Sequence, residues 1–178
     1  MLENLKKVNG NNKCAPKTII INGVVVHLKS ESKLMRFLGL LLSPFNPKFM
    51  TNYWTTLNNI VYAPSSFDDV IDKPEAHLHY LTIINHEKIH LEDQKQHPIL
   101  FRLSYVVPPV MSYGRWYWER KAYLPELIKL YEAQTSLFDY RLEQIINALG
   151  GPAYLWTWPK SWMRKWFLKE IKNRLGVS

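Results

Sequence analysis

The stretch TIIINGVVVHL at residues 18–28 constrains the fold of this chain more than any other. It places two β-branched runs on either side of Asn22-Gly23. This dipeptide is a strong hairpin signal because both positions of a tight turn favour a positive φ. A second strand pair is expected within YWTTLNNIVYAP, residues 53–64, around Leu57-Asn58-Asn59. Strand signals therefore lie early in the chain.

Helical signals follow the strands. Ser30 can cap a helix over about residues 31–42. A longer helix is expected over about residues 74–95, with Asp72 as its N-cap.

Prolines divide the later part of the chain. Pro98 and the pair Pro108-Pro109 bracket a connector, and a second long helix should span about residues 110–124 before Pro125 forces a kink or a restart. The last two expected helices cover about residues 136–149 and 160–175. Early strands and late helices indicate an α+β fold.

Length and composition favour one domain. The chain has 178 residues, of which 47% are hydrophobic, so it can bury a sizeable core. Residues 1–16 are polar and rich in Asn and Lys, and we expect them to form a flexible N-terminal segment. A single domain is expected over residues 17–178.

Composition also excludes several kinds of site. Cys14 is the one cysteine, so the chain has no disulfide framework or cysteine-built metal site, and His, Glu and Asp remain as metal ligands. Residues 34–42, LMRFLGLLL, are too short to cross a bilayer. The first ten residues lack the apolar segment of a signal peptide, so we expect a soluble protein without a classical export signal.

The stretch HEKIH at residues 86–90 indicates a metal site. In a helix, His86 and His90 lie about 6 Å apart on one face, so two imidazole nitrogens can meet one zinc ion. Glu87 is turned by about 100° from His86 and lies beside the ion, where a general base is needed. The same spacing also arises by chance, so a third ligand is needed to support it.

A catalytic zinc site takes three protein ligands and keeps one position open. His97 is one candidate, but it falls one residue late for the pattern HExxHxxGxxH, in which Asp93 occupies the place of the glycine. His97 is more readily a histidine favoured by the helix C-terminus. Asp93 shares a face with the histidine pair, but three ligands from one straight helix cannot surround a tetrahedral ion. We expect Asp93 outside the ligand set.

Glu119 is the preferred third ligand. It lies on the second long helix, so its carboxylate can approach the ion from another direction. Ala122 follows it and Gly114 precedes it, and small residues at these positions let two helices pack closely. The alternative is a surface glutamate paired with Arg115 or Lys121.

With HExxH at 86–90 and ExxA at 119–122, the chain resembles the gluzincin branch of the zincin metallopeptidases. Its small size is similar to that of the stand-alone zincins of tailed phages and bacteria. The resemblance covers about residues 50–135. It implies a single zincin-like domain that binds Zn2+ through the ligands His86, His90 and Glu119.

Two further features bear on this resemblance. The stretch LNNIVYAP, residues 57–64, looks like the edge strand of that fold, so we expect peptide to pair with the strand over residues 59–63. Tyr123 departs from the family pattern, because larger gluzincins often carry at this position an aspartate that steadies the first histidine.

The resemblance implies zinc-dependent hydrolysis of peptide bonds, in which Glu87 takes a proton from the attacking water. Tyr123 is the first candidate for stabilising the oxyanion because it follows Glu119 by one turn, although a role as a packing aromatic is the more common one for such a residue. Other candidates are Tyr113, Arg115, Tyr154 and His97. The competing class is a non-catalytic virion, assembly or binding module that keeps the zincin fold.

The expected partner is a peptide or protein substrate. The net charge of +8 suggests nucleic acid, but residues 160–178 alone carry six Lys or Arg against one Glu, and no nucleic-acid motif occurs, so we expect none. A helix within residues 156–176 can set Trp162 and Trp166 on an anionic membrane surface. The favoured interpretation is that this helix docks on the domain and covers its core. A cytoplasmic or virion-associated location is expected.

Overall fold

The computed structural model describes residues 5–8, 18–44, 46–67, 74–106 and 112–177. The chain divides into two units, residues 1–92 and 93–178, and the division falls inside the long helix α3 (Pro74–Gln96). The units are described in turn.

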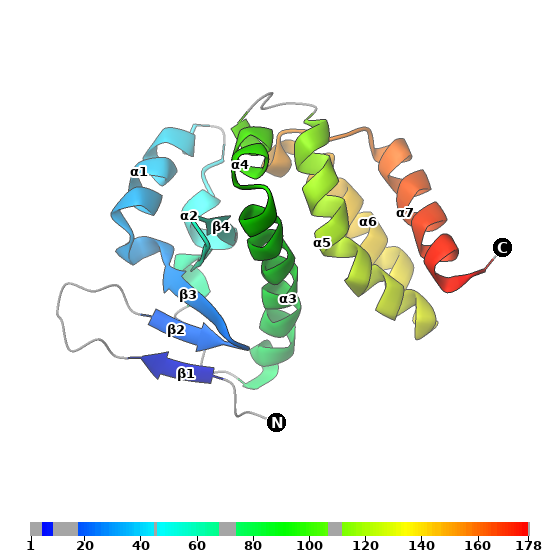
Figure 1. Cartoon of the computed structure of the whole chain (residues 1–178), viewed down its shortest axis with the longest axis horizontal. Coiled ribbons are helices and arrows are strands. Elements are labelled where there is room, and N and C mark those ends of the chain that lie inside the picture. Colours follow the sequence, from blue (N-terminus) through cyan, green and yellow to red (C-terminus); the bar gives the residue numbers. More distant parts are fainter. Residues whose placement is uncertain (1–4, 9–17, 45, 68–73, 107–111, 178) are drawn as a thin grey trace. The chain divides into compact units, whose positions relative to one another are not determined.

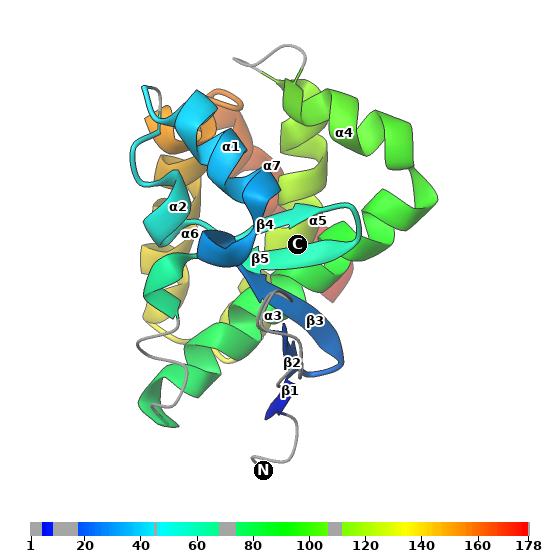
Figure 2. The ribbon, with the colours of Figure 1, turned by 90° about the vertical axis from the view of Figure 1, so that its left-hand side faces the viewer.

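The first unit is built on a five-stranded sheet with the strand order β1-β2-β3-β5-β4 (Figure 2). Its strands are β1 (Leu5–Val8), β2 (Thr18–Ile21), β3 (Val24–Leu28), β4 (Thr55–Leu57) and β5 (Ile60–Ala63). Neighbouring strands are antiparallel except for β3 and β5, which are parallel. The sequence analysis did not predict β1.

Both expected hairpins are confirmed. Asn22 and Gly23 have φ values of 49° and 77°, and the turn sets Ile21 opposite Val24. Asn58 and Asn59 have φ values of 52° and 61° in the turn between β4 and β5. Two successive positive φ values define the two-residue turn whose twist matches that of the flanking strands.

The expected edge strand over residues 59–63 is wrong. β5 pairs with β3 on one side and with β4 on the other, so its backbone groups are already used within the sheet. On this side of the described sheet the outer strand is β4, Thr55–Leu57.

The core of the first unit lies between the sheet and α3. Burial alternates along β3, so that Val24, Val26 and Leu28 point inward, as a strand with one buried face requires. These side chains pack with Phe67 and with Ile84 of α3. The bounds of α3 confirm the helix expected over residues 74–95, whereas its expected N-cap, Asp72, lies outside the described residues.

Helix α1 (Lys33–Leu42) begins two residues later than expected. Its N-cap is Ser32, whose hydroxyl accepts a hydrogen bond from the Met35 amide at 3.3 Å. The expected cap, Ser30, is wrong because it lies in a 3-10 turn over Lys29–Glu31. The short helix α2 (Phe49–Asn52) packs against α1 at Gly39, where a Cβ atom would lie 2.7 Å from the side chain of Met50.

The second unit consists of helices. They are α4 (Pro98–Val106), α5 (Tyr113–Glu132), α6 (Leu137–Leu149) and α7 (Lys160–Leu175), of which the last three lie side by side in Figure 1. α4 stands where the sequence analysis expected a connector. Pro98 opens this helix, because its missing N–H and its fixed φ suit a first turn.

α5 continues through Pro125 to Glu132, so the expected end at residue 124 and the restart at Pro125 are wrong. α6 and α7 confirm the two last predicted helices. The buried core of this unit gathers apolar side chains from α5, α6 and α7, among them Leu127, Leu142, Ile146, Met163, Phe167 and Ile171. The prediction that the C-terminal helix docks and covers a core is thereby confirmed.

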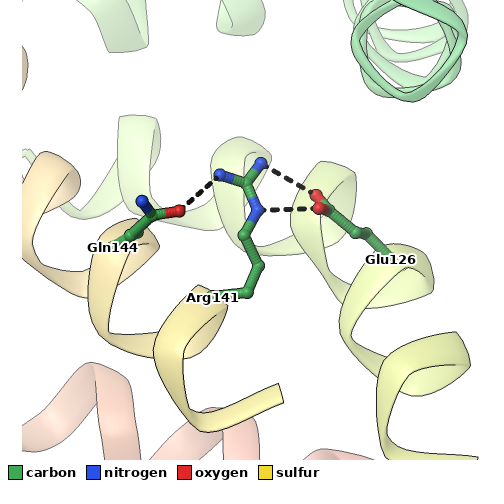
Figure 3. Close-up of polar contacts among 3 residues, drawn as sticks. All are labelled: Glu126, Arg141 and Gln144. Carbon is green, nitrogen blue, oxygen red and sulfur yellow. Dashed lines mark hydrogen bonds and ion pairs between the residues drawn. The ribbon is translucent and has the colours of Figure 1, made fainter. Parts of the chain in front are cut away.

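An ion pair ties α5 to α6 beside this core (Figure 3). The Arg141 Nε and Nη2 atoms donate to the Glu126 carboxylate at 2.7 and 3.1 Å, and Nη1 donates to Gln144 Oε1 at 3.3 Å. Burial lowers the pKa of Arg141, but the hydrogen bond and the charge of Glu126 more than offset this, so the pKa is raised. The forked geometry orients the two helices.

The helices of the described residues lack the combination of length and hydropathy that crossing a membrane requires. The α+β class is confirmed, whereas a single domain over residues 17–178 stays a prediction.

Candidate metal centre

The buried side of α3 changes from apolar to polar at residue 87. Within residues 79–96, the buried side chains are Ile84, Glu87, His90, Asp93 and Gln94. Burying polar and ionisable groups is costly unless other groups pair with them. These buried polar side chains therefore need hydrogen-bond or ion-pair partners, and the structure contains several.

His86 and His90 lie one turn apart on α3, and their imidazole rings point toward the same point beside the helix. Their Nε2 atoms are 3.0 Å apart, and their rings meet edge to face with centroids 4.7 Å apart. Two nitrogens bound to one tetrahedral zinc at about 2.0–2.1 Å would lie about 3.3 Å from each other. The observed separation is close to this value, so the pair fits two positions of one ion.

Glu119 on α5 completes the group. One ligand atom each from His86, His90 and Glu119 all lie within 4.8 Å of one another, and no other group of this kind occurs among the described residues. These three residues could hold a metal ion.

The alternative of a surface glutamate at this position is wrong. Glu119 is only 3% exposed, and its Oε1 atom accepts a hydrogen bond from the Tyr105 hydroxyl at 2.9 Å. The two expected surface partners bind elsewhere: Lys121 forms an ion pair with Asp93, and Arg115 donates to the carbonyl oxygens of Tyr105 and Tyr154.

Glu87 is buried next to the histidine pair and held by its own contacts. The hydroxyl of Thr56, on β4, donates to Glu87 Oε2 at 2.5 Å. A hydrogen bond this short is typical of a hydroxyl donating to a carboxylate. It fixes one oxygen of Glu87.

Lys29 is fully buried in the same unit. Its Nζ atom donates to the Phe49 carbonyl oxygen at 2.8 Å and lies 3.7 Å from the centroid of the Phe49 ring. Burial lowers the pKa of Lys29 to about 7, and the charge of Glu87 opposes part of that shift. Glu87 therefore has a cationic neighbour in its unit whose charge changes near neutral pH.

The other residues singled out from the sequence have different surroundings. Asp93 is buried and forms an ion pair with the partly exposed Lys121. His97 is exposed, with its ring 5.7 Å from that of Trp118. The Tyr123 hydroxyl lies 3.4 Å from that of Tyr154, and its ring packs against the helical core.

Comparison of the chain with protein-family models, with curated proteins and with solved structures gave no match. The zincin resemblance therefore rests on residues 86–90 and 119–122 and on the group of side chains that they supply.

Sequence reasoning missed three side chains that contact or influence the candidate site residues. Tyr105 lies in α4, which was expected to be a connector, so its helical position was not considered. Thr56 and Lys29 lie 31 and 58 positions before Glu87, and nothing in their local sequence signals the contact. Only the tertiary structure of the first unit reveals them.

Proposed function

We propose that the chain is a zinc-dependent hydrolase of peptide bonds, with His86, His90 and Glu119 as the metal ligands. The observation that carries the proposal is the clustering of these three ligand atoms within 4.8 Å next to the buried Glu87. Two imidazoles and one carboxylate are a donor set typical of catalytic zinc, whereas structural zinc sites usually take four protein ligands.

A bound zinc ion would supply Lewis acidity, which polarises a peptide carbonyl and makes water a better nucleophile near neutral pH. The other steps of the reaction depend on side chains of the protein. They must orient the ligands, accept and return a proton, and stabilise the developing oxyanion.

Glu87 is the proposed general base. Thr56 occupies its Oε2 atom, which leaves Oε1 to accept the proton of the attacking water and to return it to the departing amine. Tyr105 orients the Glu119 carboxylate through its 2.9 Å hydrogen bond, as partners of metal ligands commonly do. Tyr123 remains the first candidate for the oxyanion donor, because it follows Glu119 by one turn on α5.

The test compares zinc content and peptide cleavage in four proteins: wild type, His90→Ala, Glu87→Gln and Glu92→Gln. Glu92 is exposed on the same helix and serves as the matched control. We expect about one zinc per wild-type chain, and its loss in His90→Ala. Glu87→Gln should keep zinc and fold but lose at least about a hundredfold in turnover, because general-base catalysis contributes about that much or more.

Three outcomes would contradict parts of this proposal. If Glu92→Gln loses as much turnover as Glu87→Gln, the assignment of the base is wrong. If wild type holds zinc but cleaves nothing in broad peptide libraries, the results favour a non-catalytic binding module. If zinc binds equally to wild type and to His90→Ala, the proposed ligand set is wrong.

A further inference from the structure

Helix α1 is apolar around most of its circumference, yet only part of it is covered. Met35 and Gly39 are buried, and Leu38 and Leu42 pack with them against the small core around Phe49. The opposite side is open. A helix that is apolar all round is normally buried on all sides, so the open side of α1 is unusual.

The open side carries four large apolar side chains. Phe37, Leu40 and Leu41 are 64%, 75% and 61% exposed, and Leu34 is 40% exposed. At about 100° per residue, these four positions fall within an arc of about 120° and form one stripe along the helix, with Lys33 in the same arc at the N-terminal end. Singly exposed apolar side chains need no explanation, whereas a contiguous stripe indicates a surface that something covers.

The charged side chains of α1 itself are of one sign, and the exposed Glu31 precedes the helix. Lys33 and Arg36 on α1 and Lys48 just before α2 are exposed. The sequence holds no Asp or Glu between Glu31 and Asp68. The covering surface must therefore offer apolar contact together with negative charge.

We propose that α1 lies in the headgroup region of an anionic lipid surface, with the stripe of Leu34, Phe37, Leu40 and Leu41 immersed and Lys33 and Arg36 at the phosphates. Helices that carry an apolar stripe flanked by basic residues bind membranes in this way. At 10 residues, α1 is about 15 Å long, half of what crossing the hydrocarbon core requires, but sufficient to lie along its surface.

A second copy of the chain fits this surface less well. Each copy carries a net charge of +8, and pairing two α1 helices would bring like charges together at the point of contact. Lipid headgroups such as phosphatidylserine supply the opposite charge. The proposal is independent of the metal centre and of any hydrolase activity.

The C-terminal helix provides a matched comparison, because it was the sequence-based candidate for membrane contact. α7 uses Met163, Phe167 and Ile171 for the core, and its other apolar side chains, Trp166, Leu168 and Leu175, pack partly buried against it. Trp162 is 67% exposed and stands apart from them. Replacing Trp162 therefore removes an exposed aromatic without touching the stripe on α1.

The test is co-sedimentation of the full chain with vesicles of phosphatidylcholine, with or without phosphatidylserine. We expect binding only when phosphatidylserine is present, and weaker binding as salt is raised. The double variant Phe37→Ser, Leu40→Ser should lose at least about tenfold in affinity, because immersed apolar side chains drive such binding. Trp162→Ser should stay within about twofold of wild type. Both changes are at exposed positions, and equal melting temperatures will show that the fold is kept.

Three results would overturn the proposal. The first is equal binding of wild type to both kinds of vesicle, or to neither. The second is a loss in Trp162→Ser as large as in the double variant. The third, from sedimentation without vesicles, is a wild type that self-associates while the double variant is monomeric, which would identify a second copy as the occupant.

Discussion

Replacing Lys29 with methionine should change how the stability of the protein depends on pH. Lys29 is fully buried, and burial lowers its pKa to about 7, against 10.5 for an ordinary lysine. At a pH between these two pKa values, Lys29 is largely neutral in the folded chain and protonated in the unfolded chain. Unfolding then takes up a proton, so the free energy of unfolding rises with pH across this window. Below pH 7 both states are protonated and the penalty is constant.

The magnitude follows from the two pKa values. Between pH 7 and pH 9, a group with these values in the folded and unfolded states increases the free energy of unfolding by about 2 kcal/mol. Methionine has a similar length and no charge, so this contribution disappears in Lys29→Met. The variant also leaves the Phe49 carbonyl oxygen without the Lys29 hydrogen bond, which costs about 1–3 kcal/mol at every pH.

Urea unfolding of both proteins at pH 7 and at pH 9 measures this difference. Other groups titrate in this range, but they are shared by the two proteins and largely cancel in the comparison. We expect wild type to gain about 2 kcal/mol more than Lys29→Met over this interval. Parallel pH profiles for the two proteins would show that Lys29 is charged in the folded state throughout, and that the reasoning from burial is wrong.

Three other substitutions test the contacts described above. Thr56→Val should lower turnover by about 10–100-fold with zinc content unchanged, while Thr56→Ser, which keeps the hydroxyl, should stay close to wild type in a peptide-cleavage assay. Phe167→Ala should cost about 3–5 kcal/mol in urea unfolding, against about 0.5 kcal/mol or less for the exposed Trp162→Ala. Gly114→Ala should lower the melting temperature despite the higher helix propensity of alanine, because its Cβ would lie 2.6 Å from Ser104 Cβ.

The parts of the fold that sequence reasoning predicted are those fixed by neighbouring residues. The Asn22-Gly23 turn takes the positive φ values that its two residues tolerate, so the hairpin follows from the dipeptide itself. Gly176, with a φ of 65°, ends α7 for the same reason. The parallel pairing of β3 with β5 depends on residues far apart in the chain, so no local pattern predicts it.

Pro125 shows that the rule that proline breaks a helix can fail. Pro125 removes one backbone donor and was expected to interrupt its helix, yet the helix continues, because apolar neighbours such as Leu124 and Leu127 are buried in the core. Tertiary packing outweighs a local penalty of about 3 kcal/mol.

In the candidate site, too, the sequence predicts what depends on neighbouring residues and misses what depends on tertiary contacts. The spacing of His86 and His90 fixes their common face within one helix, so the sequence predicts the pair. The choice of Glu119 rested on its place on a second helix and on the small residues Gly114 and Ala122 near it, and the resemblance agreed with that choice. The hydroxyls of Thr56 and Tyr105 are set by tertiary contacts, and the sequence carries no signal for them.

The parallel pairing of β3 and β5 also has a consequence for the order of folding. The two hairpins close over two-residue turns, which isolated hairpins do in about 1–10 μs. Joining β3 to β5 sets Val26 beside Val61, 35 positions later in the chain, so it must close a long loop first. Local turns form early, and pairings distant in sequence limit the rate. We therefore expect two preformed hairpins to dock through this pair in the rate-limiting step of the first unit.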